Sequence, residues 1–409
     1  MIRGSLGAMR VASILDRVAG LGSDKWRVHL RARQMIGRGE PVILLTIGEP
    51  DLPTPAELIA ATHRALLAGR TGYSNGRGEA PVLQALAAKY SARSGRAVGA
   101  DQFIWVPGTQ SALFLLLMGL VEAGDEVLVA DPCYATYHGL VRATGAVTVP
   151  VALRQERGFR LDAGDLARAV TPATRLIFLN SPHNPTGAVL GRDDIRAIGE
   201  VARSHDLWIL CDEVYESLIF DGPSASPPAS TFASPFDEAD LAGRTVIASS
   251  LSKSHAAPGF RAGWCAGPAA FITRLLPLAE SMLFGAQPFI ADMAAEALSR
   301  EFAITAQMRE AYARRAAMVA GALAGVPGLQ VHAPQAGMFV MMSVQGLGLD
   351  GEAFADRLLT EEQVAVMPGS AFGAAAAGMV RLSLTVPDAA LAEGCARVAR
   401  FARRQVDGL

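Results

Sequence analysis

The feature that most constrains the fold is a series of short apolar runs, each followed by a turn and a helical pattern. The runs are nearly continuous in apolar residues and cover positions 103–106, 126–130, 146–151, 175–180, 207–211 and 244–249. Strands that are apolar at every position are buried on both faces, and strands that alternate with helices form parallel sheets. The series therefore predicts an α/β fold with a mostly parallel sheet between two helical layers.

Polar or glycine-containing clusters follow the ends of these runs. They contain Gly108, Thr109 and Gln110; Tyr134; Asn184; Asp212 and Tyr215; and Ser250, Ser252 and Lys253. Helices are expected to follow at 112–122, at 193–205 and in the segment that carries Tyr134 and Tyr137. Ligands bind beyond the carboxyl ends of the strands in open α/β sheets. The clusters are thus predicted to meet on one rim of the sheet.

Lysine is rare in this chain, and one lysine lies in the last of these clusters. Only three of its 37 Lys and Arg residues are lysines: Lys25, Lys89 and Lys253. Lys253 stands among small hydroxyl residues just after the run at 244–249. An amine can form a Schiff base with a carbonyl group, whereas a guanidinium cannot. A solvated lysine in a polar loop is the alternative that this stretch alone leaves open.

The residues of the predicted rim fit one cofactor, pyridoxal phosphate. Lys253 supplies an amine, and a carboxylate at Asp212 would keep a pyridinium nitrogen protonated, which makes the ring an electron sink. Asn184 and Tyr215 can hydrogen-bond a phenolate oxygen, and Tyr134 can stack on the ring. The donors available to the phosphate are Gly108, Thr109, Ser250 and Arg261. Each residue alone also has a structural explanation, but their common placement favours a cofactor site.

The composition excludes several other classes of protein. Apolar residues make up 51% and charged residues 19% of the 409 positions, which is typical of a folded enzyme. The formal net charge of −2 gives no electrostatic reason to expect a nucleic acid or an anionic membrane as partner. No apolar run reaches the ~20 residues that span a bilayer, and no secretory signal is recognisable.

The cysteines give no sign of a disulfide framework or a metal site. Cys133, Cys211, Cys265 and Cys395 are scattered through the chain, with no C-x-x-C pair among them. We therefore expect a cytoplasmic protein without a metal ion.

Five motifs resemble those of the class I and II aminotransferases, pyridoxal-phosphate enzymes of fold type I, and the resemblance extends over nearly the whole chain. They are Ile47-Gly48-Glu49-Pro50-Asp51, Ser181-Pro182-His183-Asn184-Pro185-Thr186-Gly187, Asp212-Glu213-Val214-Tyr215, Ser250-x-Ser252-Lys253 with Gly259-Phe260-Arg261, and Arg381-Leu382-Ser383. The resemblance implies a large α/β domain, residues 53–290, with a mostly parallel seven-stranded sheet. It also implies a small α+β domain from residues 1–52 and 291–409. The sequence favours a long helix at 288–323 between the two.

The resemblance implies a role for each residue at the centre of the site. Lys253 matches the lysine that forms the Schiff base and then moves the substrate proton. Asp212 matches the partner of the pyridinium nitrogen, while Asn184 and Tyr215 match the partners of the phenolate oxygen. The remaining cofactor contacts that it implies are Gly108, Thr109, Gln110, Tyr134, Ser250, Ser252 and Arg261.

Substrate and subunit contacts are implied in the same way. Arg381 matches the arginine that binds the substrate α-carboxylate, and Gly48 matches a glycine whose backbone approaches the substrate; Asn184 is also expected to contact the substrate. Tyr73 matches a tyrosine that reaches the cofactor phosphate of a neighbouring subunit, which implies a homodimer with its active sites at the interface. Trp26 is interpreted as a core residue.

The implied reaction moves the α-amino group of an L-amino acid to a 2-oxo acid, pyruvate or 2-oxoglutarate, by a ping-pong mechanism. Thr109 stands where some members that act on aspartate carry a lysine, and the chain is more similar to arginine–pyruvate transaminases. A neutral or basic amino acid is therefore the expected donor. An aspartate aminotransferase and a β-eliminating C–S lyase on the same scaffold remain alternatives. A non-catalytic ligand sensor is disfavoured because the full set of site residues is present.

Overall fold

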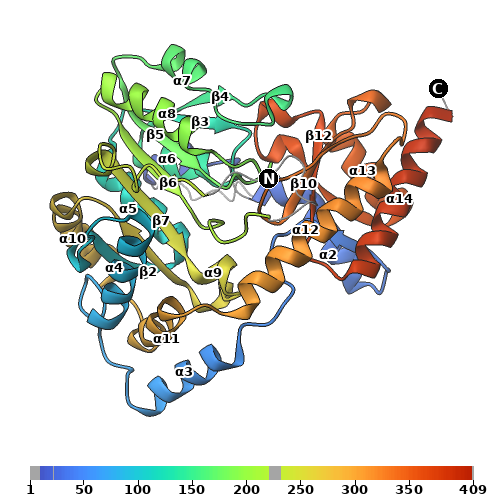
Figure 1. The fold of residues 1–409 in the computed structure, drawn as a ribbon. Coiled ribbons are helices and arrows are strands. Elements are labelled where there is room, and N and C mark those ends of the chain that lie inside the picture. Colours follow the sequence, from blue (N-terminus) through green and yellow to red (C-terminus); the bar gives the residue numbers. More distant parts are fainter. Residues whose placement is uncertain (1–9, 22, 221–231, 408–409) are drawn as a thin grey trace.

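Two sheets organise the chain in the computed structural model, which describes residues 10–21, 23–220 and 232–407 (Figure 1). The larger sheet has seven strands in the order β2-β8-β7-β6-β5-β3-β4. Its strands are β2 (Phe103–Pro107), β3 (Glu126–Asp131), β4 (Val147–Ala152), β5 (Thr174–Asn180), β6 (Trp208–Asp212), β7 (Thr245–Ser250) and β8 (Ala262–Ala266). The pairs from β4 through β3, β5 and β6 to β7 are parallel. The predicted mostly parallel seven-stranded sheet is confirmed.

Strand β8 departs from the parallel pattern and lies outside the six apolar runs that predict the other strands. It pairs antiparallel with both β7 and β2. The strand begins with Ala262 and Gly263, which have little strand propensity. Its position between two buried neighbours makes it a strand, and the sequence alone does not reveal that position.

The helices cover the faces of both sheets, and several of those near the two ends of the chain lie against the smaller sheet. They are α1 (Ile14–Arg17), α2 (Arg27–Gly37), α3 (Ala56–Leu67), α4 (Ala80–Ser94), α5 (Gly108–Leu120), α6 (Tyr137–Thr144), α7 (Ala163–Ala169), α8 (Arg192–Ser204), α9 (Leu251–Ser254), α10 (Ala269–Leu283), α11 (Pro288–Ser299), α12 (Ala303–Leu323), α13 (Gly351–Glu362) and α14 (Asp388–Asp407). Along β5, Leu176 and Phe178 belong to one buried cluster, whereas Ile177 and Leu179 belong to another. Successive side chains of a strand point to opposite faces, so this strand is buried on both sides.

The smaller sheet joins the beginning of the chain to its end. Its order is β1-β11-β12-β10-β9, and its strands are β1 (Ile43–Leu45), β9 (Gln330–His332), β10 (Phe339–Ser343), β11 (Val364–Pro368) and β12 (Met379–Ser383). β1 pairs in parallel with β11, and the other pairs are antiparallel. The N-terminal segment is thereby held on the C-terminal part of the chain.

The predicted helix at 288–323 is wrong as a single element. It is divided into α11 and α12 by an extended segment, in which Arg300 has φ −153° and Phe302 has φ −118°. No proline or glycine marks the break, so the helical pattern continues through it. The helices pack on different partners, because α11 lies against α3 and α4, whereas α12 contacts α14, β9 and β10.

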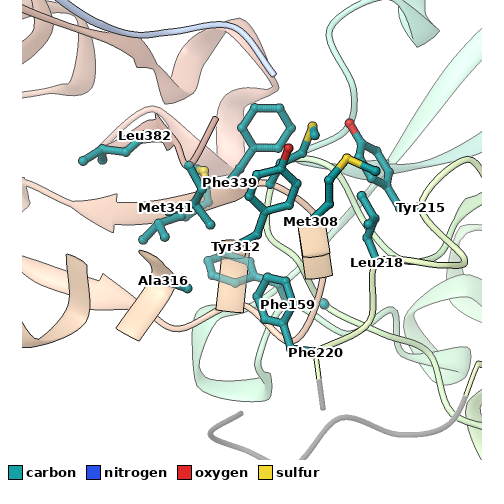
Figure 2. Packing of buried hydrophobic residues seen from close by; sticks show 14 of the residues in the cluster. Phe159, Tyr215, Leu218, Phe220, Met308, Tyr312, Ala316, Phe339, Met341 and Leu382 are labelled. Atoms are coloured by element: carbon teal, nitrogen blue, oxygen red, sulfur yellow. The ribbon is translucent and has the colours of Figure 1, made fainter. Parts of the chain in front are cut away.

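Helix α12 lies between the two sheets and carries part of the core that links them. Met308, Tyr312 and Ala316 project from it towards buried residues on both sides, as Figure 2 shows. These neighbours include Phe339, Met341 and Leu382 from the smaller sheet, and Tyr215 and Leu218 from the segment after β6. Burial of large apolar side chains stabilises a fold by about 1.5–3 kcal/mol each.

Candidate active site

A cavity of about 210 Å³ lies where the carboxyl ends of β5 and β6 meet the edge of the smaller sheet. Most of the predicted site residues line it: Gly48, Thr109, Gln110, Tyr134, Asn184, Asp212, Tyr215, Ser252, Lys253, Arg261 and Arg381. Most of the residues predicted to meet on one rim of the sheet therefore line a single cavity. Its walls come from both sheets, because Ile47, Phe339 and Arg381 belong to the smaller sheet or its connections.

Lys253 enters the cavity from the short helix α9, directly after β7. Ser250 caps this helix, because its hydroxyl accepts a hydrogen bond from the Ser252 backbone N–H. The Lys253 Nζ donates a hydrogen bond to the Gly48 carbonyl oxygen at 2.6 Å. Desolvation lowers the pKa of Lys253 to about 8. About a tenth of the amine is thus uncharged at pH 7, and the uncharged amine is the form that attacks a carbonyl carbon.

Asp212 is the last residue of β6, and its carboxylate is buried. It accepts hydrogen bonds from the Tyr137 hydroxyl at 2.8 Å and from the Val214 backbone N–H at 3.1 Å. Burial raises the pKa of Asp212 to about 6, although these hydrogen bonds act in the opposite direction. No arginine or lysine forms an ion pair with it among the described residues. A protonated ring nitrogen would supply the missing positive charge.

Arg381 is a buried guanidinium without a carboxylate partner among the described residues. It is 2% exposed, and its Nη1 and Nη2 donate to Asn184 Oδ1 at 3.1 Å and to the Thr46 carbonyl oxygen at 2.7 Å. The rings of Phe339 and Phe372 lie 3.7 and 4.3 Å from it, and its Nε has no hydrogen-bond partner. Desolvation lowers the pKa of Arg381 to about 10. A buried charge needs a partner, and a substrate carboxylate would be one.

The predicted phosphate site is built around the first turn of α5. This helix begins at Gly108, four residues before the predicted start. The turn expected after the strand is the first turn of the helix itself. Gly108 has a φ of +82°, and a Cβ there would lie 2.4 Å from Arg261 Nη2. The first N–H groups of a helix have no intrahelical partner and bind anions. Together with the Arg261 guanidinium they form a cradle that suits a phosphate group.

Thr109 and Ser250 join the two sides of this cradle. The Thr109 hydroxyl donates a hydrogen bond to the Ser250 hydroxyl at 2.8 Å. Gly263 has to be small as well, because a Cβ there would lie 2.5 Å from the Gly108 backbone. The close approach of α5 to β8 therefore depends on a pair of glycines.

Three tyrosines and a tryptophan differ in their position relative to the cavity. Tyr134 lines the cavity from the loop before α6, so the prediction that a helix carries it is wrong. Tyr137, from the first turn of α6, was missed as a site residue, although its hydroxyl holds Asp212. Trp26 also lines the cavity, in addition to packing against Phe372 and its neighbours. Tyr73 is 91% exposed and lies outside the cavity of its own chain.

The donor set fits pyridoxal phosphate. An amine at Lys253 faces the cavity together with a buried carboxylate at Asp212 and a tyrosine hydroxyl at Tyr215. The cradle at Gly108 supplies backbone donors and the Arg261 guanidinium for a phosphate. No group of three or more His, Cys, Asp or Glu suited to a metal ion occurs in the described ranges, and no helix there has the length and apolar character to cross a membrane.

Comparisons with known proteins agree with this geometry. A family model described as "Aminotransferase class I and II" matches residues 40–398. The arginine–pyruvate transaminase AruH of Pseudomonas aeruginosa is 44% identical over 391 residues, which cover 96% of this chain and 98% of that protein. An aspartate aminotransferase of Musicola paradisiaca is 32% identical, with 91% and 92% covered. The structure of the Thermus thermophilus aspartate aminotransferase with maleate matches with a TM-score of 0.87 and 32% identity, covering 96% and 100%.

Proposed function

Because the chain belongs to the class I and II aminotransferase family, whose members use pyridoxal phosphate, we propose that it transfers the α-amino group of a basic or neutral L-amino acid to pyruvate or 2-oxoglutarate. The two half-reactions would alternate in a ping-pong cycle. The observation that carries the proposal is one cavity that brings together an amine at Lys253, a buried carboxylate at Asp212 and a buried guanidinium at Arg381, which has no carboxylate partner within the described ranges.

The residues that would hold the cofactor surround the cavity on all sides. Asp212 would face the ring nitrogen, Asn184 and Tyr215 the phenolate oxygen, and Tyr134 the face of the ring. The phosphate would be held by Gly108, Thr109, Gln110, Ser250, Ser252 and Arg261. When bound, pyridoxal phosphate supplies an electron sink for the charge that remains at the substrate Cα after its proton leaves.

The chain's own residues position the substrate and move its proton. Arg381 binds the α-carboxylate by a charge-assisted pair, and Gly48 and Asn184 bound the same end of the cavity. The Lys253 amine, held by the Gly48 carbonyl oxygen, takes the proton from Cα as a general base. Phe339 and Phe372 exclude water from the guanidinium, so the ion pair with the carboxylate forms in a medium of low dielectric constant.

The side chain of the donor would meet Trp26 and Thr109. The cations that line the cavity are Lys253, Arg261 and Arg381, each assigned above to the cofactor or the α-carboxylate, so the second carboxylate of aspartate has no further cation in this lining. A tryptophan ring attracts a guanidinium or ammonium group by about 0.5–2 kcal/mol. The similarity to an arginine–pyruvate transaminase favours the same class of donor.

A half-reaction screen tests the donor. Purified holoenzyme is mixed with single L-amino acids, and the change in cofactor absorbance is followed. We expect arginine, lysine or neutral amino acids to react faster than aspartate. In Trp26→Ala, the half-reaction with arginine should be about tenfold slower, whereas the rate with alanine should change little. Aspartate as the only fast donor would contradict the proposal and support the second candidate, an aspartate aminotransferase, which other relatives favour. Continuous release of pyruvate and ammonia from a cysteine conjugate, with no acceptor present, would indicate a C–S lyase.

Removal of the Arg381 guanidinium should weaken the binding of all amino donors to the same degree. In Arg381→Ala we expect KM to rise about 100-fold for every amino acid, because one charge-assisted pair with the shared carboxylate contributes about 1.5–3 kcal/mol. Steady-state kinetics with arginine and alanine measure this effect, and Arg381→Lys serves as the control that keeps the charge but loses the planar fork. A loss confined to one donor would show that Arg381 recognises a side chain.

Cofactor capture should depend on pH through Lys253. Its pKa is lowered to about 8, so roughly 1% of the amine is uncharged at pH 6 and roughly 90% at pH 9. Since the uncharged amine is the nucleophile, the rate at which the cofactor-free protein takes up pyridoxal phosphate should rise with pH and level off above about 8. Stopped-flow absorbance measures this rate. A rate that is flat from pH 6 to pH 9 would exclude such a lowered pKa.

We propose that the protein is a homodimer with its sites at the interface. Tyr73 is exposed and makes an edge contact with Phe284, itself 65% exposed, so an apolar pair is uncovered in the single chain. In a dimer the partner's Tyr73 would reach the cofactor phosphate. Sedimentation velocity tests the assembly, and a monomer at micromolar concentration would contradict it.

We also propose a division into a large domain, residues 53–290, and a small one from 1–52 and 291–409. The pairing of β1 with β11 supports the shared small domain. The packing of α11 on α3 and α4 favours moving the second boundary to the break after Ser299. Limited proteolysis with mapping of the cleavage sites would distinguish the two positions.

A further inference from the structure

The turn after β6 presents its side chains to two different environments. Asp212 and Tyr215 face the cavity. Glu213 and Glu216 face the other way, and both are buried away from solvent, with side-chain exposures of 0% and 9%. Backbone hydrogen bonds from Glu213 N to the Ala248 carbonyl oxygen and from Glu216 N to the Glu213 carbonyl oxygen tie the turn to β7 and to itself.

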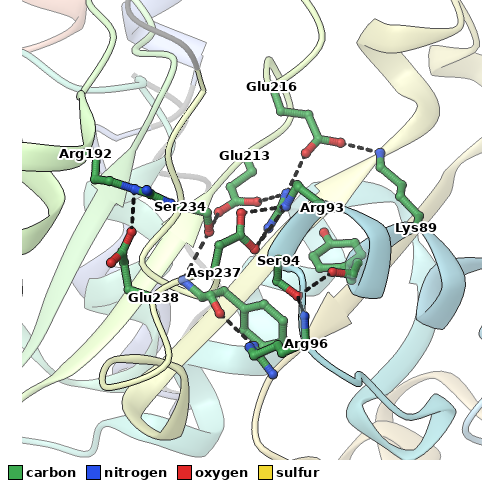
Figure 3. Close-up of polar contacts among 12 residues, drawn as sticks. Lys89, Arg93, Ser94, Arg96, Arg192, Glu213, Glu216, Ser234, Asp237 and Glu238 are labelled. Atoms are coloured by element: carbon green, nitrogen blue, oxygen red, sulfur yellow. Dashed lines mark hydrogen bonds and ion pairs between the residues drawn. The ribbon is translucent and has the colours of Figure 1, made fainter.

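A single guanidinium from α4 contacts both glutamates. Arg93 Nη1 lies 2.8 Å from Glu213 Oε2 and 2.7 Å from Glu216 Oε2, and Arg93 Nε lies 2.9 Å from Asp237 Oδ2 (Figure 3). Lys89, one helical turn earlier on the same face of α4, pairs with Glu216. The Ser234 hydroxyl donates to Glu213. The side of the turn that faces away from the cavity is therefore fixed at two points by one side chain.

We propose that Arg93 is a positioning residue, which holds the turn so that Asp212 and Tyr215 keep their places in the cavity. This inference rests on the proposed function, because it takes the cofactor roles of Asp212 and Tyr215 from there. Arg93 itself does not line the cavity. It would act through the backbone of a turn whose residues Asp212, Val214 and Tyr215 line the cavity.

The charges around the turn show why the guanidinium is needed. Three carboxylates, Glu213, Glu216 and Asp237, face two cations, Arg93 and Lys89. Burial raises the pKa of Glu213 to about 7, while Arg93 acts in the opposite direction. Loss of one partner leaves a buried charge uncompensated, so we expect the turn to move until water or a proton reaches the carboxylates. A displacement of about 1 Å at a reacting group can cost about 100-fold in rate.

The test is Arg93→Lys, which keeps one charge but loses the fork that reaches three carboxylates. We expect kcat to fall about 10- to 100-fold. The dissociation constant for pyridoxal phosphate, measured on the cofactor-free protein, should rise about tenfold, and the pH midpoint of the bound cofactor's absorbance should shift, because Asp212 has moved. Glu213→Gln, which retains the shape and a hydrogen-bonding side chain, should give the same changes in a milder form.

Glu362→Gln provides the matched control. Glu362 is another buried glutamate, with 5% side-chain exposure, paired with Arg400 and Arg404 on α14. Its neutralisation should lower the thermal midpoint while leaving kcat, cofactor affinity and the absorbance midpoint unchanged. If Arg93→Lys also changes only the thermal midpoint, Arg93 is merely structural and the proposal is overturned. If the wild-type protein binds the cofactor but transaminates no amino acid, the proposed function fails, while cofactor affinity and absorbance still decide the role of Arg93.

Discussion

Replacement of Lys253 by alanine is expected to abolish transamination, with a fall in kcat of about 10⁴-fold or more. The alanine side chain offers neither an amine to bind the cofactor carbonyl nor a base to take the proton from the substrate Cα. Lys89 and Lys25 cannot substitute, because Lys89 pairs with Glu216 on the far side of the turn and Lys25 donates to the Ala135 carbonyl oxygen. Single-turnover absorbance with arginine as donor measures the loss.

The control for this variant is Lys253→Arg, which keeps a positive charge at the hydrogen bond to Gly48. It should be as inactive as the alanine variant, since a guanidinium forms no Schiff base under these conditions. Residual turnover within tenfold of wild type in either variant would show that another group performs the chemistry. Gel filtration of both variants checks that the fold is retained.

Replacement of Asp212 by alanine is expected to lower kcat about 1000-fold, the second largest effect. A preorganised charge in a water-excluded site contributes about 10²- to 10³-fold when it stabilises charge that develops during the reaction. Asp212 is such a charge, because it is buried and fixed by the Tyr137 hydroxyl and the Val214 N–H. Steady-state kinetics with cofactor in excess separates this loss from weaker cofactor binding.

The shape-preserving variant Asp212→Asn distinguishes the charge from the fold. Burial raises the pKa of Asp212 to about 6, above its ordinary value, so the stability it contributes is present at low pH and lost as pH rises through about 6. Without cofactor, Asp212→Asn should therefore be no less stable than wild type at pH 8. A large drop in the thermal midpoint with unchanged kcat would contradict the assignment.

The continuous apolar runs predict six strands of the large sheet, because residues such as Ile177 and Phe178 pack on opposite faces of the same strand. The site could be predicted for a related reason. Thr109, Asn184, Asp212 and Lys253 follow the ends of strands of the larger sheet, and such ends lie on one rim whatever the loops between them do. Arg381 lies within a strand of the smaller sheet, and only the family resemblance indicated it.

Features set by distant packing could not be predicted in this way. The break between α11 and α12 carries no local signal, since it reflects the change of partners on either side. The sequence favours a core position for Trp26, and its ring does pack against the cluster that contains Phe372, but the same ring also lines the cavity. The contact of Arg93 with Glu213 joins residues 120 positions apart, and no pattern within either segment specifies it.

The placement of Trp26 has a consequence for how such enzymes diversify. This residue ends a short 3-10 helix, Ser23–Trp26, which belongs to neither sheet, and its side chain is only partly buried. Exchanges in such peripheral segments usually change the free energy of unfolding by less than about 0.5 kcal/mol. Under the proposed contact of Trp26 with the donor side chain, the amino acid that the enzyme accepts can change during evolution through the N-terminal segment, while Arg381, proposed to bind the carboxylate that every amino acid shares, remains buried in the interior.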